Sequence, residues 1–381
     1  MSAIQDVFRR FYPDFCKSYR PFAQQAKAAT NILFCKTSAL GGRVCGCDGC
    51  GFTQVLYNSC RNRHCPSCQG IAKSVWVDQR SEDLLDAPYF HIVFTVPEQL
   101  HPLIYQNQAL LYSLLYKAVS KTLAKLCGDP KYLGVQAGFF AVLHTWGQDL
   151  HYHPHLHVVM LAGGLTPLQD WRSSSKKFFL PVKVLAKVFR GKFLYHLKQA
   201  YQENRLKFYG SARPWQEKQA FQELVDQCYA KDWYTYTQRT FSGPLAVIKY
   251  LSNYTHRIAI SNSRIQSVNE QSVTFTVKDY QDGSKTKSIT LSGVEFVRRF
   301  LLHTLPKGFV KIRYYGILAN RNRKTKLALC RKLSKSRFYR SRLKGLKTAE
   351  IIFLLTGKDV TVCPKCQTKL RVYTLCPGAS P

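Results

Sequence analysis

The fold is decided by the stretch HTWGQDLHYHPHLHVVML, which occupies residues 144–161. Near its end, His155 and His157 flank Leu156 and lead into an apolar run at 158–161. In a strand, residues i and i+2 point to the same face, so both imidazoles would project side by side. This spacing suits two ligands of one metal ion, and the alternative is a His-rich strand end with solvated rings.

A second informative stretch is SGPLAVIKYLSNYTHR, residues 242–257. Ser242 can cap a helix and Pro244 is tolerated in its first turn. Tyr250 and Tyr254 are four apart, so both hydroxyls would project from nearly the same helix face. A phenol is a poor nucleophile at neutral pH and requires activation, for example beside a metal ion. Taken alone, the spacing favours ordinary packing of a helix against a sheet.

A His-hydrophobe-His strand followed by a Tyr-x-x-x-Tyr helix resembles the rolling-circle, two-tyrosine transposases of bacterial insertion sequences, members of the HUH endonuclease superfamily. Three further segments resemble that family's zinc signature, first catalytic strand and C-terminal segment: 59–69, 90–97 and 313–321. The resemblance therefore covers roughly residues 30–325, in the expected order.

The resemblance implies that His155 and His157 hold a divalent ion, Mg²⁺ or Mn²⁺, with a third polar ligand. Asp149 is the candidate for that ligand, with Gln148 as its substitute. Tyr250 or Tyr254 would attack the scissile phosphate, leaving a 5′-phosphotyrosine and a free 3′-hydroxyl. Covalent capture retains the phosphodiester energy, so no ATP is expected.

The expected activity is that of a DNA transposase acting on single-stranded DNA at the element ends and at the target. Two alternatives stay close: a replication initiator or relaxase-like nickase of the same superfamily, and a non-catalytic zinc-ribbon DNA-binding protein. A metal-dependent hydrolase is a further rival, since His-x-His also begins hydrolase sites. A hydrolase would leave no covalent protein–DNA adduct.

The cysteines are distributed like metal ligands in a reducing compartment. Cys47-x-x-Cys50 and Cys65-x-x-Cys68 predict one structural zinc ribbon with four thiolate ligands. Outside this set lie residues that could complete a second zinc site: Cys35, Cys45, Cys60 and His64. The remaining group, Cys363, Cys366 and Cys376, is equally compatible with half a metal site and with a loose tail.

The charge balance indicates a polyanionic partner. Lys and Arg number 56 against 22 Asp and Glu, a formal charge of +34, so nucleic acid is the leading candidate. Residues 321–347 alone hold 12 Lys or Arg and no acidic residue. The predicted DNA contacts are Arg61, Arg63, Arg321 and Arg323. No apolar run approaches the ~18 residues of a spanning helix, so no membrane partner and a cytoplasmic, nucleoid-associated location are expected.

The order of elements predicts an α+β protein. Strands at 89–96, 135–146 and 153–161, with a helix near 106–126, fit an HUH-type antiparallel sheet with flanking helices. Further helices are expected near 183–208, 215–230 and 293–303, and a hairpin at 272–291. The predicted organisation is a helical N-terminal segment (1–34), a zinc-binding domain (35–70), a catalytic domain (85–305) and a basic C-terminal region (306–381).

Overall fold

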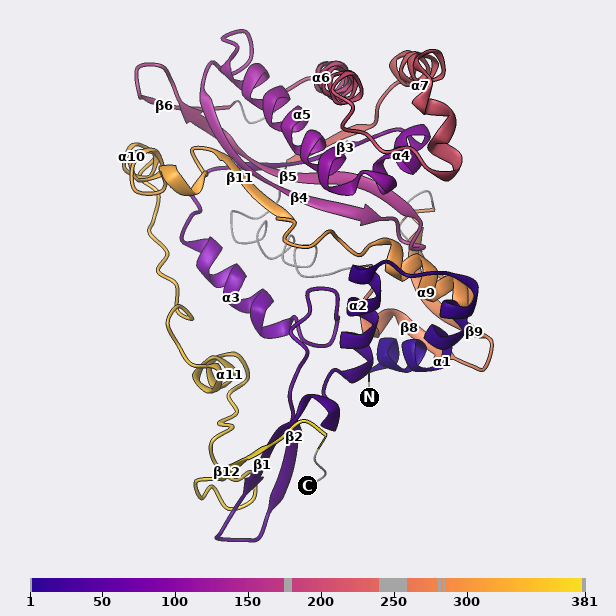
Figure 1. The fold of residues 1–381 in the computed structure, drawn as a ribbon. Coiled ribbons are helices and arrows are strands. Elements are labelled where there is room, and N and C mark those ends of the chain that lie inside the picture. The colour runs from indigo at the N-terminus through magenta and orange to yellow at the C-terminus, as the bar shows by residue number, and fades with distance from the viewer. Residues whose placement is uncertain (1, 175–179, 240–258, 280–281, 284, 379–381) are drawn as a thin grey trace.

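The computed structural model describes residues 2–174, 180–239, 259–279, 282–283 and 285–378. Its centre is a six-stranded antiparallel sheet in the order β11-β4-β5-β3-β7, with β6 paired to the end of β5 (Figure 1). The strands are β3 (Tyr89–Thr95), β4 (Gln136–Trp146), β5 (Tyr152–Leu165), β6 (Trp171–Ser173), β7 (Thr235–Arg239) and β11 (Ile312–Gly316). The predicted α+β class is confirmed.

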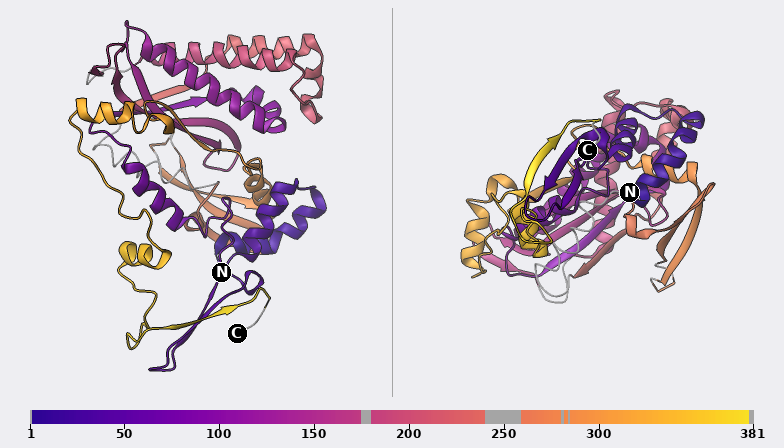
Figure 2. Two further views of the ribbon diagram at one scale, coloured as in Figure 1. Left: turned by 60° about the vertical axis from the view of Figure 1, so that its left-hand side comes forward. Right: turned by 90° about the horizontal axis from the view of Figure 1, so that it is seen from below.

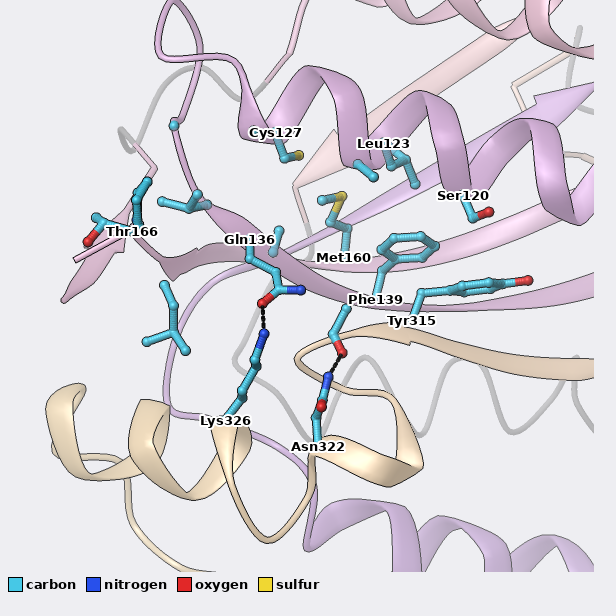
Figure 3. Close-up of a pocket in the computed structure, with 18 of the residues that line it drawn as sticks. Ser120, Leu123, Cys127, Gln136, Phe139, Met160, Thr166, Tyr315, Asn322 and Lys326 are labelled. Carbon is cyan, nitrogen blue, oxygen red and sulfur yellow. Dashed lines mark hydrogen bonds between the residues drawn. The ribbon is translucent and has the colours of Figure 1, made fainter. Parts of the chain in front are cut away.

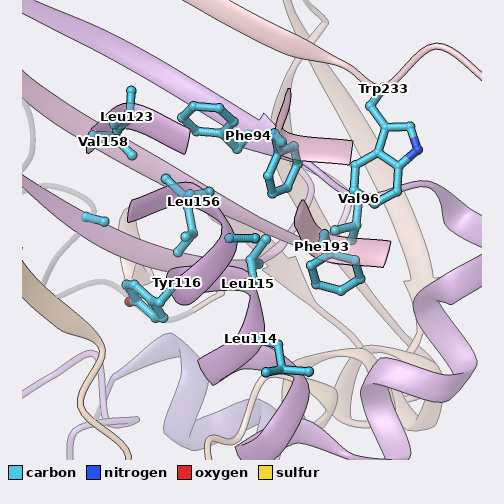
Figure 4. Packing of buried hydrophobic residues seen from close by; sticks show 14 of the residues in the cluster. Phe94, Val96, Leu114, Leu115, Tyr116, Leu123, Leu156, Val158, Phe193 and Trp233 are labelled. Atoms are coloured by element: carbon cyan, nitrogen blue, oxygen red, sulfur yellow. The ribbon is translucent and has the colours of Figure 1, made fainter. Parts of the chain in front are cut away.

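One face of this sheet is mainly apolar and lies under a layer of helices. The layer consists of α4 (His101–Gln106), α5 (Gln108–Gly128), α6 (Val182–Gln202) and α7 (Lys218–Ala230). Ile92, Phe94, Leu156 and Val158 supply the sheet's side of the contact, each fully buried. Figure 4 shows Leu156 and Phe94 close to α5 and α6 side chains such as Leu115. Each such side chain stabilises the fold by about 1.5–3 kcal/mol.

The opposite face is built by the alternate residues of the same strands. Tyr89, Phe140, Val159 and Leu161 form a smaller apolar cluster there. Residues of α3 (Gly70–Ser81) and α10 (Lys326–Leu333) pack against it. Strand period 2 explains the division, because antiparallel partners such as Val159 and Phe140 project to the same side.

The N-terminal helices α1 (Ala3–Ser18) and α2 (Ala23–Phe34) do not stand alone. They share a second core with α9 (Gly293–Leu302) and a three-stranded sheet of β8 (Ile265–Val268), β9 (Ser272–Asp279) and β10 (Lys285–Ser292). Phe8 meets Phe300 edge to face, with ring centroids 5.2 Å apart. The first 34 residues therefore stabilise the part of the chain that follows residue 258.

A second three-stranded sheet joins strands from the N-terminal and C-terminal regions of the chain. β1 (Gly42–Gly46) pairs with β2 (Thr53–Tyr57) on one side and with β12 (Arg371–Leu375) on the other. The chain reaches β12 from α10 by way of α11 (Thr348–Thr356), descending beside α3 (Figures 1 and 2). Among the described residues, no helix is long and apolar enough to cross a bilayer.

Candidate active site and metal centres

Three histidines converge on the face of the central sheet opposite α5 and α6, which we call the polar face. His155 and His157 lie on β5, and His144 on β4 is the direct partner of His155 across the ladder. The ligand nitrogens of all three lie within 4.8 Å of one another. The expected pair on β5 thus gains a third imidazole from the neighbouring strand.

Hydrogen bonds fix which ring nitrogens face the centre of this cluster. His155 Nδ1 lies 2.6 Å from the His153 carbonyl oxygen, which can only accept, so this nitrogen carries the proton. The lone pair is therefore on Nε2, which lies 3.0 Å from Nε2 of His157. Two nitrogens bound to one ion at ~2.1 Å and about a right angle would be about 3 Å apart. The pair is spaced for a shared ion.

A fourth histidine, His91, contacts His157 on the side of the ring away from the cluster. His91 on β3 places Nε2 2.8 Å from Nδ1 of His157, with the two rings almost parallel. With His157 Nε2 turned toward the centre, its Nδ1–H can donate to His91. Metal-bound imidazoles usually donate their second N–H to an acceptor, which fixes tautomer and ring orientation.

Burial keeps these rings neutral. Desolvation lowers the pKa of His155 to about 3 and the pKa of His91 to about 4. The pKa of His157 is also well below its ordinary value, mainly through burial. Neutral imidazole is the form that binds metal ions, so the cluster is ready to accept one at neutral pH.

The structure offers His144 as a third ligand, in place of the expected Asp149 or Gln148. Asp149 hydrogen-bonds Nδ1 of His151, and this contact holds its pKa at about 2. Its carboxylate also lies 3.9 Å from Arg299. The backbone carbonyl oxygen of Gln148 accepts a hydrogen bond from Arg264 over 2.6 Å. Both residues sit in the turn beyond the paired ends of β4 and β5, whereas His144 lies within the ladder.

Sequence reasoning also missed a cation beside the cluster. Lys311 is 4% exposed, and burial lowers its pKa to about 7. Its ammonium lies 4.9 Å from the Trp146 ring centroid, and that ring stacks on His144 at 4.6 Å. No motif marks a single lysine just before β11. Only the pairing of β11 with β4 brings it here.

Tyr250 and Tyr254, with their expected helix, lie outside the described residues. The described chain leaves off at Arg239, the last residue of β7, and resumes at Ala259. β7 pairs with β3, the strand that carries His91. Ala259 and Ile260 share an apolar cluster with Leu150 in the turn between β4 and β5.

The predicted four-cysteine ribbon is also corrected. Cys65 and Cys68 cluster with Cys35 and Cys60, not with Cys47 and Cys50. Cys60 and Cys68 bring their sulfurs to 3.6 Å, and the Cys60 N–H faces the Cys35 sulfur at 3.5 Å. The reason is that β1 and β2 carry Cys47 and Cys50 away to the far end of the hairpin.

Cys47 and Cys50 instead meet Cys363 and Cys366 from the C-terminal region. The sulfurs of Cys47 and Cys366 are 3.3 Å apart. Cys376 is exposed and belongs to neither cluster.

Cys45 and His64, which were expected to be able to complete a second zinc site, lie apart from the cysteine clusters. Cys45 is buried in β1. His64 accepts the Leu305 N–H at Nε2 over 3.1 Å, and burial lowers its pKa to about 3. Neither belongs to a cysteine cluster.

The four predicted DNA-binding arginines divide into two kinds. Arg61, Arg63 and Arg321 are exposed, and Arg323 is half-buried. Arg63 donates to the Phe309 carbonyl oxygen over 2.7 Å, and Arg323 forms an ion pair with Asp83. The last two therefore also hold the fold together.

Arg321 lines a pocket of about 720 Å³ at the edge of the sheet. In Figure 3, Lys326 reaches Gln136 and Asn322 reaches back to β11 beside this pocket. None of the clustered histidines lines it.

Acidic residues of α3 and of the segment that follows it hold the basic segment, residues 321–347, in place. Asp78 is 8% exposed and accepts from the Tyr339 hydroxyl over 2.7 Å and the Leu343 N–H over 2.9 Å. Asp86 accepts the Arg337 N–H over 2.8 Å. Hydrogen bonds to a carboxylate are stronger than neutral ones, so this segment is fixed along α3 and its exposed cations face outward.

Comparison with known proteins gives consistent family matches. The family described as "Putative transposase" matches residues 138–326, and the family described as "Transposase zinc-binding domain", of IS91 type, matches residues 7–96. A Sinorhizobium fredii protein described as "Putative transposase y4qJ" is 42% identical over 376 residues, 95% of this chain and 92% of the relative. The transposase for insertion sequence element IS801 of Pseudomonas savastanoi pv. phaseolicola is 29% identical over 303 residues, 78% of this chain and 71% of the relative.

Two solved structures are also similar. The conjugative relaxase TrwC with oriT DNA, metal-bound, aligns with TM-score 0.24 and 12% identity over 44% of this chain and 71% of that one. Its copper-bound form aligns with TM-score 0.22 and 12% identity over 43% and 68%.

Proposed function

Because the chain belongs to the insertion-sequence transposase family with an IS91-type zinc-binding domain, we propose that it nicks and rejoins single-stranded DNA through a 5′-phosphotyrosine intermediate. The observation that carries this proposal is the convergence of His144, His155 and His157 on one point of the sheet's polar face. A DNA transposase of this kind would act at the bacterial nucleoid.

The donor set fits a divalent ion. Two ligand nitrogens stand 3.0 Å apart, and the rings are neutral because they are buried. An ion held there would polarise the scissile phosphate and neutralise charge on its oxygens. Imidazole ligands suit Mn²⁺ better than Mg²⁺, which prefers oxygen, so we expect stronger activity with Mn²⁺.

The chain's own residues would bind and orient the DNA around this point. Lys311 places its amino group over Trp146, which stacks on His144, and the protonated form of this amine would attract a phosphate. Tyr236 of β7 pairs with Val93, which in turn pairs with His157. Antiparallel partners share a face, so the Tyr236 ring lies on the polar face, as His157 does. This ring is 40% exposed, and a DNA base could stack on it.

The tyrosines supply the nucleophile in this proposal. Tyr250 or Tyr254 Oη would form a bond to phosphorus as the P–O3′ bond breaks. The phenolic proton leaves and the departing 3′ oxygen gains one. The 3′-hydroxyl later reverses the reaction on the same or another strand, so no external energy source is required. Two tyrosines permit one end to stay bound while the second strand is cut.

The proposal is tested by incubating the protein with a labelled single-stranded oligonucleotide from the element's end and Mn²⁺. We expect an adduct that survives denaturing electrophoresis. It should disappear when both tyrosines are replaced (Tyr250→Phe with Tyr254→Phe). The matched control is Tyr195→Phe, an exposed tyrosine of α6, which should leave the adduct unchanged.

The outcomes also separate the rival functions. Binding without cleavage by the unaltered protein, under any divalent ion, would favour the zinc-ribbon DNA-binding protein. Cleavage without an adduct would indicate a hydrolase. Adduct formation without strand joining to a second oligonucleotide would favour a nickase of the replication-initiator or relaxase type.

A further inference from the structure

We propose that Cys47, Cys50, Cys363 and Cys366 bind a structural zinc ion of their own, which fastens the C-terminal region onto the N-terminal zinc-binding module. Two of these ligands lie inside the matched zinc-binding family region, residues 7–96. The other two lie beyond both matched regions, since the transposase match ends at residue 326. We call this group the zinc clasp.

The sulfur positions fit one tetrahedral ion. The Cys47 and Cys366 sulfurs are 3.3 Å apart, and those of Cys50 and Cys363 are 3.5 Å apart. A tetrahedral site with Zn–S bonds of about 2.3 Å has sulfur–sulfur distances of about 3.8 Å. The observed contacts are far longer than a disulfide bond of ~2.05 Å. All four sulfurs lie within 4.8 Å of one another.

The two Cys-x-x-Cys turns have the same backbone pattern. The Cys47 N–H bonds the Phe52 carbonyl, and the Cys363 N–H bonds the Thr368 carbonyl, in each case five residues on. The N–H four residues after each first cysteine, Gly51 and Gln367, returns to that cysteine's carbonyl oxygen.

Both of these residues adopt positive φ, 66° for Gly51 and 60° for Gln367. Gly51 adopts this conformation at no steric cost, whereas Gln367 bears the strain of a side chain. The two turns therefore have the same conformation, and their four cysteine sulfurs lie close together. This is the arrangement expected of two metal-binding loops that share one ion.

The sheet that joins the two loops has little apolar core to hold it. In β12, Val372 is 56% exposed and Tyr373 is 57% exposed. The ion pair of Arg371 with Asp48, at 2.6 Å, is also exposed and therefore contributes little. Small sheets without a core usually depend on a metal or on disulfides. A zinc ion would supply the missing stabilisation.

The clasp has a consequence for the basic segment. Asp78 and its neighbours hold this segment along α3, and the clasp holds the chain again beyond α11. Residues 344–362 are thus fixed at both ends beside the module that contains Arg61. Loss of the clasp should free the C-terminal end and weaken DNA binding, with the histidine cluster left intact.

The second cluster is independent of the clasp. Cys35 and Cys65, 3% and 2% exposed, belong to the core that α1 and α9 share. This separation allows the clasp to be removed without removing the buried cluster.

The test measures zinc per chain in the purified full-length protein by elemental mass spectrometry. The variant Cys363→Ser with Cys366→Ser should lose one equivalent, and so should Cys47→Ser with Cys50→Ser. All four changes together should lose the same single equivalent, because both pairs serve one ion. Cys376→Ser with Cys16→Ser, two exposed cysteines outside the clusters, should lose none.

Losses that add to two equivalents in the fourfold variant, or no loss from the C-terminal pair, would overturn the proposal. A measurement on the unaltered protein guards against variants that fail to fold. Cys50 and Cys366 are exposed, yet zinc-bound thiolates should resist alkylation until a chelator is added. Alkylation of both at the rate of Cys376 before chelation, or a disulfide found by mass mapping, would also overturn it.

Discussion

On β5, Leu156 and Val158 point into the apolar core beneath α5 and α6, whereas His155 and His157 point to the opposite face. All four residues are less than 10% exposed. The first face is held by burial alone. On the second face, the Nε2 lone pairs of His155 and His157 point toward each other. Neither nitrogen can donate a hydrogen bond to the other, and apolar neighbours offer no donor. The difference teaches that the same strands supply apolar packing on one face and a cluster of imidazoles on the other.

The largest effect should come from His157→Ala, because this change removes a ligand without removing core. We expect nicking to fall by at least about 100-fold, more than the 10–100-fold typical of supporting residues. The rate of adduct formation with Mn²⁺ measures it, and thermal unfolding serves as the control. A variant that nicks at the normal rate would contradict a catalytic role for the histidine face.

The neighbouring substitution Leu156→Ala should do the reverse. It leaves a cavity in the core and should lower the free energy of unfolding by about 2–5 kcal/mol. Urea denaturation measures that loss, and Mn²⁺ affinity below the unfolding transition should stay normal. If Leu156→Ala lowered the Mn²⁺ affinity as much as His157→Ala does, the two faces would not have separate roles in stability and ion binding.

A smaller effect is expected for His91→Phe, which removes the hydrogen bond to His157 Nδ1. Ion affinity should weaken by about 10–100-fold, and raised Mn²⁺ should restore nicking. Measuring activity as a function of Mn²⁺ concentration distinguishes this weakened affinity from the loss of a metal ligand. A defect that excess Mn²⁺ does not rescue would assign His91 another role.

The last prediction concerns the pH dependence of stability in protein freed of metal. The pKa of His155 is lowered from 6.5 to about 3 by burial, so the folded state favours the neutral ring. Its contribution to stability is complete above pH 6.5 and is lost as pH falls toward 3. The slope is at most ~1.4 kcal/mol per pH unit for one group. His155→Gln should flatten the curve measured by urea denaturation, and an unchanged curve would show that the ring is not buried neutral.

Local periodicity was sufficient for the strands and for placing His155 and His157 on one face of a strand. The alternation around Leu156 predicted His155 and His157 because one strand's geometry depends only on neighbouring residues. It could not reveal His144, which requires the register of the hairpin. That register contains an irregularity between His144 and Trp146, so counting from the turn would not have found it.

The cysteine grouping shows the same limit over a longer distance. Cys47 and Cys366 are 319 residues apart in the chain, and no spacing rule links them. Nearby pairs were grouped instead, although β1 and β2 separate them in space. Tyr250 and Tyr254 stay predictions, since they lie outside the described residues.

The most direct test of the account is anomalous diffraction at the manganese edge from crystals of the protein grown with Mn²⁺. The account predicts one strong peak on the polar face of the sheet, within bonding distance of the imidazoles of His144, His155 and His157. A peak beside Asp149 instead, or no ion near these histidines under conditions that support nicking, would contradict it.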